Sequence, residues 1–306
     1  MKGLLLAKAY YEEYGEAMLE RFPEQSGRIA AGLAGHGSEC YGFDDALSRD
    51  HDYGPGFCLW LYAGDYKTIG GELQKAYESL PGSYLGFPPR NVTPRGANRV
   101  GVLEIGAFYR EFTGRTDAPV TPVEWLRIPE EGLAAATNGV VFRDPGGAFT
   151  AVRERLLAYY PEDVRLVKIA ARAAGMAQAG QYNYARCMRR GEQVAARLSL
   201  DEFVRQTMAM CYLLCRVFMP FYKWAYRGLL ALPIHARIRE GLAALAETGV
   251  CTENAAAIEE ICRIIREELT RQHLTHGEED FLETHAWRIT ERITDPGMRE
   301  QIIMKG

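Results

Sequence analysis

The sequence lacks long apolar runs and paired-cysteine motifs. No segment reaches the ~20 consecutive apolar residues of a membrane-spanning helix, and the richest run, residues 208–221, is interrupted by Arg216 and Pro220. The seven cysteines form no Cys-x-x-Cys pair and are odd in number, which favours reduced thiols over a disulfide scaffold. The three consecutive leucines near the N-terminus are too few for a signal peptide. We therefore expect a cytoplasmic protein with no membrane segment.

The sequence also lacks a strong excess of charge of either sign. Lysine and arginine total 36 against 40 aspartate and glutamate, which gives a formal charge of −4. A phosphate backbone needs a basic surface, so nucleic acid is not an expected partner. Apolar residues make up 47% and charged residues 25% of the 306 residues. These are globular proportions, and they exclude a disordered tail or a collagen-like fibre.

The two halves of the chain differ in pattern and predict two domains of an α+β protein. Residues 1–150 hold most of the glycine and proline and nearly all the strand-like runs, which predicts a mixed sheet with flanking helices. Residues 151–306 follow helical periodicity almost throughout, which predicts an all-α bundle. Strands are expected at 29–34, 57–62, 100–105 and 140–142. Helices are expected at 4–21, 66–80, 107–112, 148–159, 162–190, 199–218, 221–230, 234–248, 255–272 and 278–293.

The most informative pattern is a glycine–serine turn followed by two aspartates. Gly37 and Ser38 come just after the strand expected at 29–34, and Asp50-x-Asp52 follows after eleven residues. A glycine lets the backbone approach a phosphate closely, and the serine hydroxyl with nearby N–H groups can hold phosphate oxygens. On a strand, residues two apart face the same side, so Asp50 and Asp52 would present two carboxylates together. Such oxygen-rich clusters suit Mg²⁺, which binds one or two carboxylates plus substrate phosphates.

Glu104 is the candidate for a third carboxylate. It lies in the strand expected at 100–105, where its neighbours are apolar residues or glycine. A buried charge in such a strand needs a partner. If this strand pairs beside the strand that carries the two aspartates, the three carboxylates converge on a site for Mg²⁺ or Mn²⁺. Ions held in this way can activate an attacking hydroxyl and neutralise charge on a leaving phosphate.

These residues resemble the signature of the polymerase-beta-type nucleotidyltransferase superfamily, a Gly-Ser pair followed after a short gap by Asp-x-Asp/Glu. The order of expected elements is also similar over roughly residues 1–150. The helical second half resembles the antibiotic-modifying branch, such as the aminoglycoside and lincosamide nucleotidyltransferases. The string Ser48-Arg49-Asp50-His51-Asp52-Tyr53-Gly54-Pro55 is similar to a bacterial family within that superfamily that is catalogued only as a domain of unknown function.

The resemblance implies a fold, an activity and a set of residues. It implies an N-terminal nucleotidyltransferase sheet and transfer of a nucleoside monophosphate from an NTP, with ATP the expected donor, to a hydroxyl of a small-molecule acceptor. Gly37 and Ser38 would hold the nucleotide phosphates, whereas Asp50, Asp52 and Glu104 would be the catalytic, metal-binding acids. This chain departs from the usual pattern in having His36 before the glycine and His51 between the aspartates. Either histidine could be a metal ligand or a satisfied polar neighbour.

Basic residues of the second half supply further nucleotide-binding candidates. Arg186 shares a helix face with Asn183 and Arg190, and Lys223 lies in the aromatic string 221–227. Cations on semi-buried helices need anionic partners. A triphosphate would serve, as would an internal ion-pair network, and the spacing does not choose between them. Lys223 and Arg186 are the residues from this half that we expect to contact the nucleotide.

Several alternatives stay open from the sequence. A non-catalytic nucleotide-binding or regulatory module would keep the same fold, and a nucleotidyltransferase of this type could instead act on RNA or protein. Arg90, Arg95 and Arg99 belong to a loop rich in proline and glycine, where they could steer an anionic substrate or simply be solvated. The acceptor, the preferred nucleotide and the formation of a homodimer are not fixed by the residues.

Overall fold

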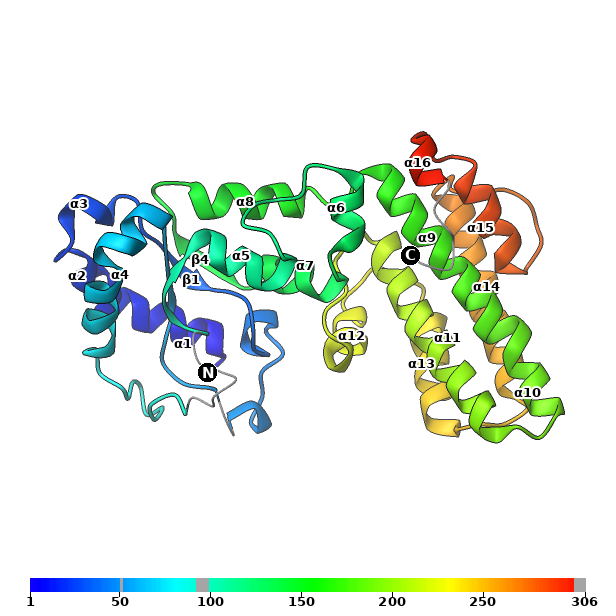
Figure 1. Ribbon diagram of the computed structural model, residues 1–306. Coiled ribbons are helices and arrows are strands. Elements are labelled where there is room, and N and C mark those ends of the chain that lie inside the picture. The colour runs from blue at the N-terminus through cyan, green and yellow to red at the C-terminus, as the bar shows by residue number, and fades with distance from the viewer. Residues whose placement is uncertain (50–51, 92–98, 300–306) are drawn as a thin grey trace. The chain divides into compact units, whose positions relative to one another are not determined.

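The computed structural model describes residues 1–49, 52–91 and 99–299. The chain forms two compact units (Figure 1). Unit 1 comprises residues 1–120 and 128–158, and unit 2 comprises residues 121–127 and 159–306. Unit 1 extends to residue 158, a few residues beyond the boundary expected at residue 150. The short segment 121–127, which precedes that boundary, belongs to unit 2.

Unit 1 is built on a four-stranded mixed sheet in the order β3-β2-β1-β4. β1 is antiparallel to both β2 and β4, whereas β2 and β3 are parallel. All four strands lie within the ranges expected from the apolar runs, give or take a residue. The strands are β1 (Ala30–Leu33), β2 (Cys58–Leu61), β3 (Gly101–Glu104) and β4 (Val140–Arg143).

The helices of unit 1 follow the expected order, with two short helices, α3 and α7, that were not predicted. The N-terminal helix expected at 4–21 is present but contains a π-helical turn, η1, and a short helix expected by no pattern, α7, precedes β4. The helices are α1 (Gly3–Tyr10), η1 (Tyr11–Gly15), α2 (Glu16–Leu19), α3 (Pro23–Ser26), α4 (Ala63–Glu78), α5 (Ile105–Thr113), α7 (Glu130–Thr137) and α8 (Ala148–Leu157). Single 3-10 turns lie at Glu39–Tyr41 and Leu47–Arg49.

Both faces of the sheet are covered, because successive side chains of each strand point to opposite sides. On one face, Leu59 and Leu61 pack against aromatic and aliphatic residues of α1, η1 and α4. On the other face, Trp60 stacks on Phe149 of α8 at 3.8 Å between ring centroids and meets Phe108 of α5 edge-on. The short strands are therefore held by two cores, and they form a rigid base for the loops at their ends.

Unit 2 is entirely helical among its described residues, as its periodicity predicts. Its longest expected helix is split into α9, a π-helix and α10, and α11 begins six residues before the start indicated by the capping-box spacing of Ser199 and Glu202. The helices are α6 (Pro122–Arg127), α9 (Glu162–Met176), η4 (Ala177–Tyr184), α10 (Ala185–Arg189), α11 (Gln193–Leu214), α12 (Tyr222–Leu229), α13 (Ala236–Thr248), α14 (Asn254–Arg271), α15 (Leu282–Thr290) and α16 (Pro296–Arg299).

A buried arginine ties three helices of unit 2 together. The Arg165 side chain of α9 is 2% exposed and donates to the Leu213 carbonyl of α11 at 3.1 Å. The same guanidinium donates to Gln272 at the end of α14 at 2.8 Å and to Glu162 at 3.0 Å. Because the Arg165 guanidinium would be costly to bury without acceptors, these hydrogen bonds hold the helix ends in one arrangement.

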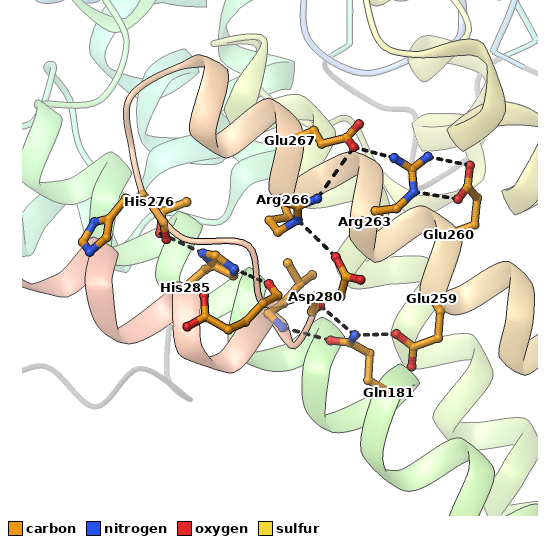
Figure 2. A network of polar contacts seen from close by, with 12 residues as sticks. Gln181, Glu259, Glu260, Arg263, Arg266, Glu267, His276, Asp280 and His285 are labelled. Carbon is orange, nitrogen blue, oxygen red and sulfur yellow. Dashed lines mark hydrogen bonds and ion pairs between the residues drawn. The ribbon is translucent and has the colours of Figure 1, made fainter.

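A second polar network joins η4 to the C-terminal helices of unit 2 (Figure 2). Gln181 donates to Glu259 of α14 at 2.7 Å and to the Asp280 carbonyl at 2.9 Å. Arg266 of α14 lies 3.1 Å from the Asp280 carboxylate. The loop before α15 is therefore fixed to both η4 and α14.

Within the described ranges, no helix is long and apolar enough to cross a membrane.

The buried His285 of α15 predicts a pH dependence of stability. Its Nε2 lies 2.6 Å from the Glu279 carbonyl and its Nδ1 lies 2.9 Å from the Thr275 hydroxyl. A carbonyl only accepts, so Nε2 carries a proton and donates to it, and in the neutral imidazole Nδ1 is an acceptor that faces the Thr275 hydroxyl. Burial lowers the pKa of His285 below its usual value of 6.5.

We expect the free energy of unfolding to fall as the pH drops below about 6.5, because the unfolded chain then binds a proton before the folded one does. His285 would contribute a slope of at most about 1.4 kcal/mol per pH unit. Urea unfolding between pH 5 and 8 measures it, and His285→Gln should remove this part of the slope. His276→Gln, at an exposed position of the same loop, is the control. Identical slopes for wild type and His285→Gln would contradict the assignment.

Candidate functional site

The candidate site lies at one end of the sheet of unit 1. Because β1 and β2 are antiparallel, with Gly32 opposite Cys58, the turn after β1 and the segment before β2 meet at the same end. The first holds Gly37 and Ser38, and the second holds Asp52. The topology therefore brings the glycine–serine turn toward the aspartate that follows it fourteen residues later in the sequence.

A buried arginine joins these two segments. Arg90 Nη1 lies 3.3 Å from Glu39 Oε1, next to the turn, and donates to the Asp52 carbonyl at 2.6 Å. Its Nη2 donates to the Gly54 carbonyl at 3.3 Å. The Arg90 and Glu39 side chains are only 7% and 6% exposed. Arg90 is therefore an interior side chain and not a solvated one. It connects its own loop with the segments of Glu39 and Asp52.

Asp52 is a buried carboxylate held by a second arginine. Its side chain is 4% exposed, and Oδ2 lies 3.3 Å from Arg99 Nη1. Asp52 precedes β2 by six residues and has a φ of 52°, so it belongs to a loop and not to the strand on which the sequence placed it. Its expected partner Asp50, with His51, lies outside the described residues, as does Arg95.

Gly37 and Ser38 lie just after β1, where the sequence predicts a turn. Glycine is needed at position 37 because of a neighbouring side chain of the protein. Gly37 has a φ of 111°, and a Cβ added there would lie 2.6 Å from the Glu39 carboxyl carbon. Glycine is therefore required by the carboxylate of Glu39. Ser38 is half-buried, and its hydroxyl and N–H have no partner within residues 1–49, 52–91 and 99–299.

A third buried acid stands near the same turn. The Asp44 side chain is 3% exposed, accepts a hydrogen bond from the Gly3 N–H at 2.9 Å, and lies 3.7 Å from Lys2 Nζ. Together with Glu39 and Asp52 it makes three buried carboxylates in one loop region. Lys2, Arg90 and Arg99 supply three positive charges to them, so the region is balanced in charge.

Glu104 is not brought to this cluster. Cys58 is paired with Gly101 and Leu61 with Glu104, so Glu104 lies at the opposite end of the parallel β2–β3 pair. Its carboxylate accepts hydrogen bonds from the N–H groups of Gly106 at 2.8 Å and Ala107 at 2.6 Å, and so caps α5. The expected convergence of Glu104 with Asp52 is corrected here, because this acid satisfies a helix N-terminus.

The described acids do not by themselves complete a metal centre. No group of three or more His, Cys, Asp or Glu side chains that could hold an ion occurs in the part of the chain that the structure describes. Asp52 has the buried oxygen ligands that Mg²⁺ prefers, but a cation, Arg99, already stands beside them. An ion at Asp52 would therefore compete with Arg99, and Asp50 is the second ligand that the sequence offers.

The histidine and the thiols near the turn have structural surroundings. His36 Nε2 lies 2.8 Å from Glu111 of α5, and its ring contacts Phe112. Burial raises the pKa of the Cys58 thiol to about 12 and raises that of Cys40 well above its usual value. Because a thiol must ionise to attack, neither cysteine is placed to act as a nucleophile.

The candidate cations of unit 2 are near aromatic rings. Arg186 lies 4.7 Å from the Tyr182 ring centroid, and the exposed Lys223 lies 4.5 Å from that of Trp224. Neither forms a salt bridge with any described residue. Two acids of unit 2 that could have served as internal partners are engaged elsewhere, since Glu162 pairs with Arg165 and Arg216, and Asp201 pairs with Arg197.

The sequence reasoning missed two of the buried acids, Glu39 and Asp44. The sequence offered one signal for Glu39. An acid directly after the Gly-Ser pair would repel a phosphate bound there, so its charge needs a cation nearby. Arg90 was a candidate for steering an anionic substrate. Its burial comes from its contact with the loop of Asp52, which lies 38 residues earlier in the sequence. Spacing along the sequence does not reveal such a contact.

Replacing Arg90 with Met should destabilise unit 1 strongly. The substitution leaves the Glu39 carboxylate buried without its cation, which typically costs about 3–5 kcal/mol. Neutralising the acid as well, in Arg90→Met/Glu39→Gln, should recover more than half of the loss in a urea titration. Arg197→Met is the control, since it removes an arginine from an exposed pair with Asp201 in unit 2 and should cost less than about 1 kcal/mol. Arg28→Met, whose arginine is 51% exposed in its pair with Asp65, tests a cation of unit 1 outside the cluster. Equal losses in Arg90→Met and Arg28→Met would contradict the account.

Comparison with known proteins gives one family match. A domain of unknown function, DUF4037, matches residues 125–225, which is about a third of the chain. The matched segment includes α7, β4 and α8 of unit 1 and α9 to α11 of unit 2. Neither the curated proteins nor the solved structures contain a match to this chain. The chain is thus similar in this segment to a family whose activity is not described.

Proposed function

We propose that the protein is a metal-dependent nucleotidyltransferase. It would move a nucleoside monophosphate from an NTP, with ATP the expected donor, to a hydroxyl of a small-molecule acceptor and release pyrophosphate. The single observation that carries the proposal is the Arg90 guanidinium, which joins the Gly37–Ser38 turn to the Asp52 segment. Phosphate-holding and metal-holding groups are required side by side in such an enzyme, and these two segments meet at one end of the sheet.

The turn is suited to hold phosphate oxygens. Ser38 has a hydroxyl and an N–H that are half-buried and without partners among the described residues. The two guanidinium groups of the cluster add positive charge nearby, and Arg99 is the more accessible of them at 23% exposed. Arginine matches the geometry of phosphate oxygens with paired donors. Arg99 could therefore leave Asp52 and turn to a phosphate.

Asp52 is the acid that would hold Mg²⁺ or Mn²⁺, with Asp50 as its second expected ligand. When bound, the ion would polarise the phosphate and neutralise charge on the departing pyrophosphate. Burial is itself informative, because a buried ion pair contributes little net stability compared with an apolar pair. Charged groups kept in the interior at the end of a sheet are therefore candidates for function.

Two cations of unit 2 are further proposed nucleotide-binding residues. Lys223 and Arg186 have no acidic partner in the described ranges and stay the proposed nucleotide-binding cations of this unit. The net charge of −4 argues for a small acceptor over RNA, because RNA binding needs a basic surface. The rival proposals are a non-catalytic nucleotide-binding module of the same fold and a nucleotidyltransferase that acts on RNA or protein.

The test compares Asp52→Asn with two matched variants. Calorimetry with ATP and Mg²⁺ should show binding to wild type and binding at least tenfold weaker in Asp52→Asn. Label transfer from ATP to a pool of small hydroxyl compounds should fall roughly 100-fold or more, which is about 2.7 kcal/mol of lost stabilisation. Asp117→Asn removes an exposed acid paired with Arg155, and Glu104→Gln removes the charge that caps α5. Both should bind ATP as wild type does.

Each contrary outcome has a defined meaning. Absence of Mg²⁺-dependent ATP binding in wild type contradicts the proposal. Binding without any label transfer favours the non-catalytic module, and transfer to RNA or protein but not to small compounds favours the other rival. Weakened metal binding in Glu104→Gln would show that Glu104 contributes to the metal site.

A further inference from the structure

Unit 2 contains a pocket of about 410 Å³ that the proposed function does not use. One wall is formed by the end of α9 and by η4, and the other by α11. In the ribbon, α11 packs along α9 (Figure 1). The volume falls within the range of small-molecule sites and is more than ten times the ~30 Å³ of a water molecule in the liquid. A small organic molecule would fit.

The π-helix η4 shapes one wall of this pocket. It runs for eight residues, whereas π-helical geometry usually appears as single turns and often at functional sites. Gly180 allows the close approach to α11, because a Cβ there would overlap the Phe203 ring. The polar side chains of Gln178 and Asn183 line the pocket from the same segment. The unusual helix thus brings small residues against the core and amides into the pocket.

The lining carries more positive than negative charge. It includes Arg172, Arg205 and a single acid, Glu202. Arg205 donates to both oxygens of Glu202, at 2.9 and 2.7 Å, and Gln206 donates to it at 2.6 Å. The hydrogen bond from Arg205 lowers the pKa of Glu202, so this carboxylate is charged and engaged. Arg172 donates to the neutral Gln206 amide oxygen at 3.2 Å.

Two uncharged polar side chains of the lining are available to a ligand. Asn183 and Ser199 make no side-chain hydrogen bond to any residue that the structure describes. An amide and a hydroxyl can each donate and accept, which suits the hydroxyl groups of a polyol. Ala171, Ala179 and Leu198 contribute apolar surface to the lining. The lining therefore combines cationic side chains, hydroxyl-binding groups and apolar surface.

We propose that this pocket binds a small phosphorylated polyol, the chemical class of the sugar phosphates. Arginine side chains recognise the phosphate, because their planar donors match its oxygens. Asn183 and Ser199 recognise the hydroxyl groups. The pocket lies wholly within unit 2, and its binding needs neither a divalent cation nor Asp52. It is a second site, separate from the nucleotide site proposed in unit 1.

The test measures binding to the full chain by calorimetry in the presence of EDTA. The probes are ribose 5-phosphate, glucose 6-phosphate and glycerol 3-phosphate, with ribose and inorganic phosphate as the two halves of the first. The variants are Arg205→Gln and Asn183→Ala, both at exposed positions, and Ala179→Leu, which fills the pocket. Arg197→Gln is the control, since it removes an exposed arginine from α11 that pairs with Asp201 and does not line the pocket.

At least one sugar phosphate should bind wild type saturably, with one site per chain and more tightly than ribose or inorganic phosphate. Binding should weaken at least tenfold in Arg205→Gln and Ala179→Leu and severalfold in Asn183→Ala, and stay unchanged in Arg197→Gln. Asp52→Asn should bind the sugar phosphate as wild type does, which separates this site from the nucleotide site.

Three outcomes would overturn the proposal. The first is a Kd above about 1 mM for all three sugar phosphates. The second is equal affinity of wild type, Arg205→Gln and Asn183→Ala, which would place binding elsewhere. The third is inorganic phosphate binding as tightly as the sugar phosphates, which would leave no role for the hydroxyl-binding groups.

Discussion

The buried guanidinium of Arg90 is the contact on which the architecture of unit 1's loop region depends. It connects the turn after β1, the segment before β2 and the chain that leads toward β3. Buried carboxylates are tolerated only where cations meet them. Glu39 and Asp52 therefore stay in the interior because Arg90 and Arg99 are there too. The requirement for glycine at position 37 follows from the same contact, since the Glu39 carboxylate takes the space of a side chain.

This arrangement changes the meaning of the Asp-x-Asp pattern in this chain. The sequence predicted two aspartates on a strand and a third acid on its neighbour. Asp52 instead lies in a loop at the end of the sheet where β1 finishes, and Glu104 lies at the other end and caps a helix. A site at the first end draws its charge from the loops. Arg90 and Arg99, for which the sequence left substrate steering and solvation both open, pair with the buried acids of this region.

Much of the fold could be predicted, because it depends on local pattern. The strands coincide with short apolar runs, and the helices of unit 2 follow their periodicity. The helix α6 was missed although its signal is present: Thr121 and Glu124 exchange hydrogen bonds as a capping box around Pro122 at the first position. The burial of Arg90 and the capping by Glu104 could not be predicted, because both depend on strand pairing and register. The widening of the helix at η4 likewise depends on packing against α11.

The central claim is that the glycine–serine turn and Asp52 form one nucleotide site. The most direct measurement is a crystal structure with Mn²⁺ and a non-hydrolysable ATP analogue, in which the anomalous signal locates the ion. The account predicts a manganese peak beside the Asp52 carboxylate, phosphate oxygens at Ser38, and Glu104 still bound to the N-terminus of α5. A nucleotide bound away from the turn, or manganese at Glu104 without Asp52, would contradict it.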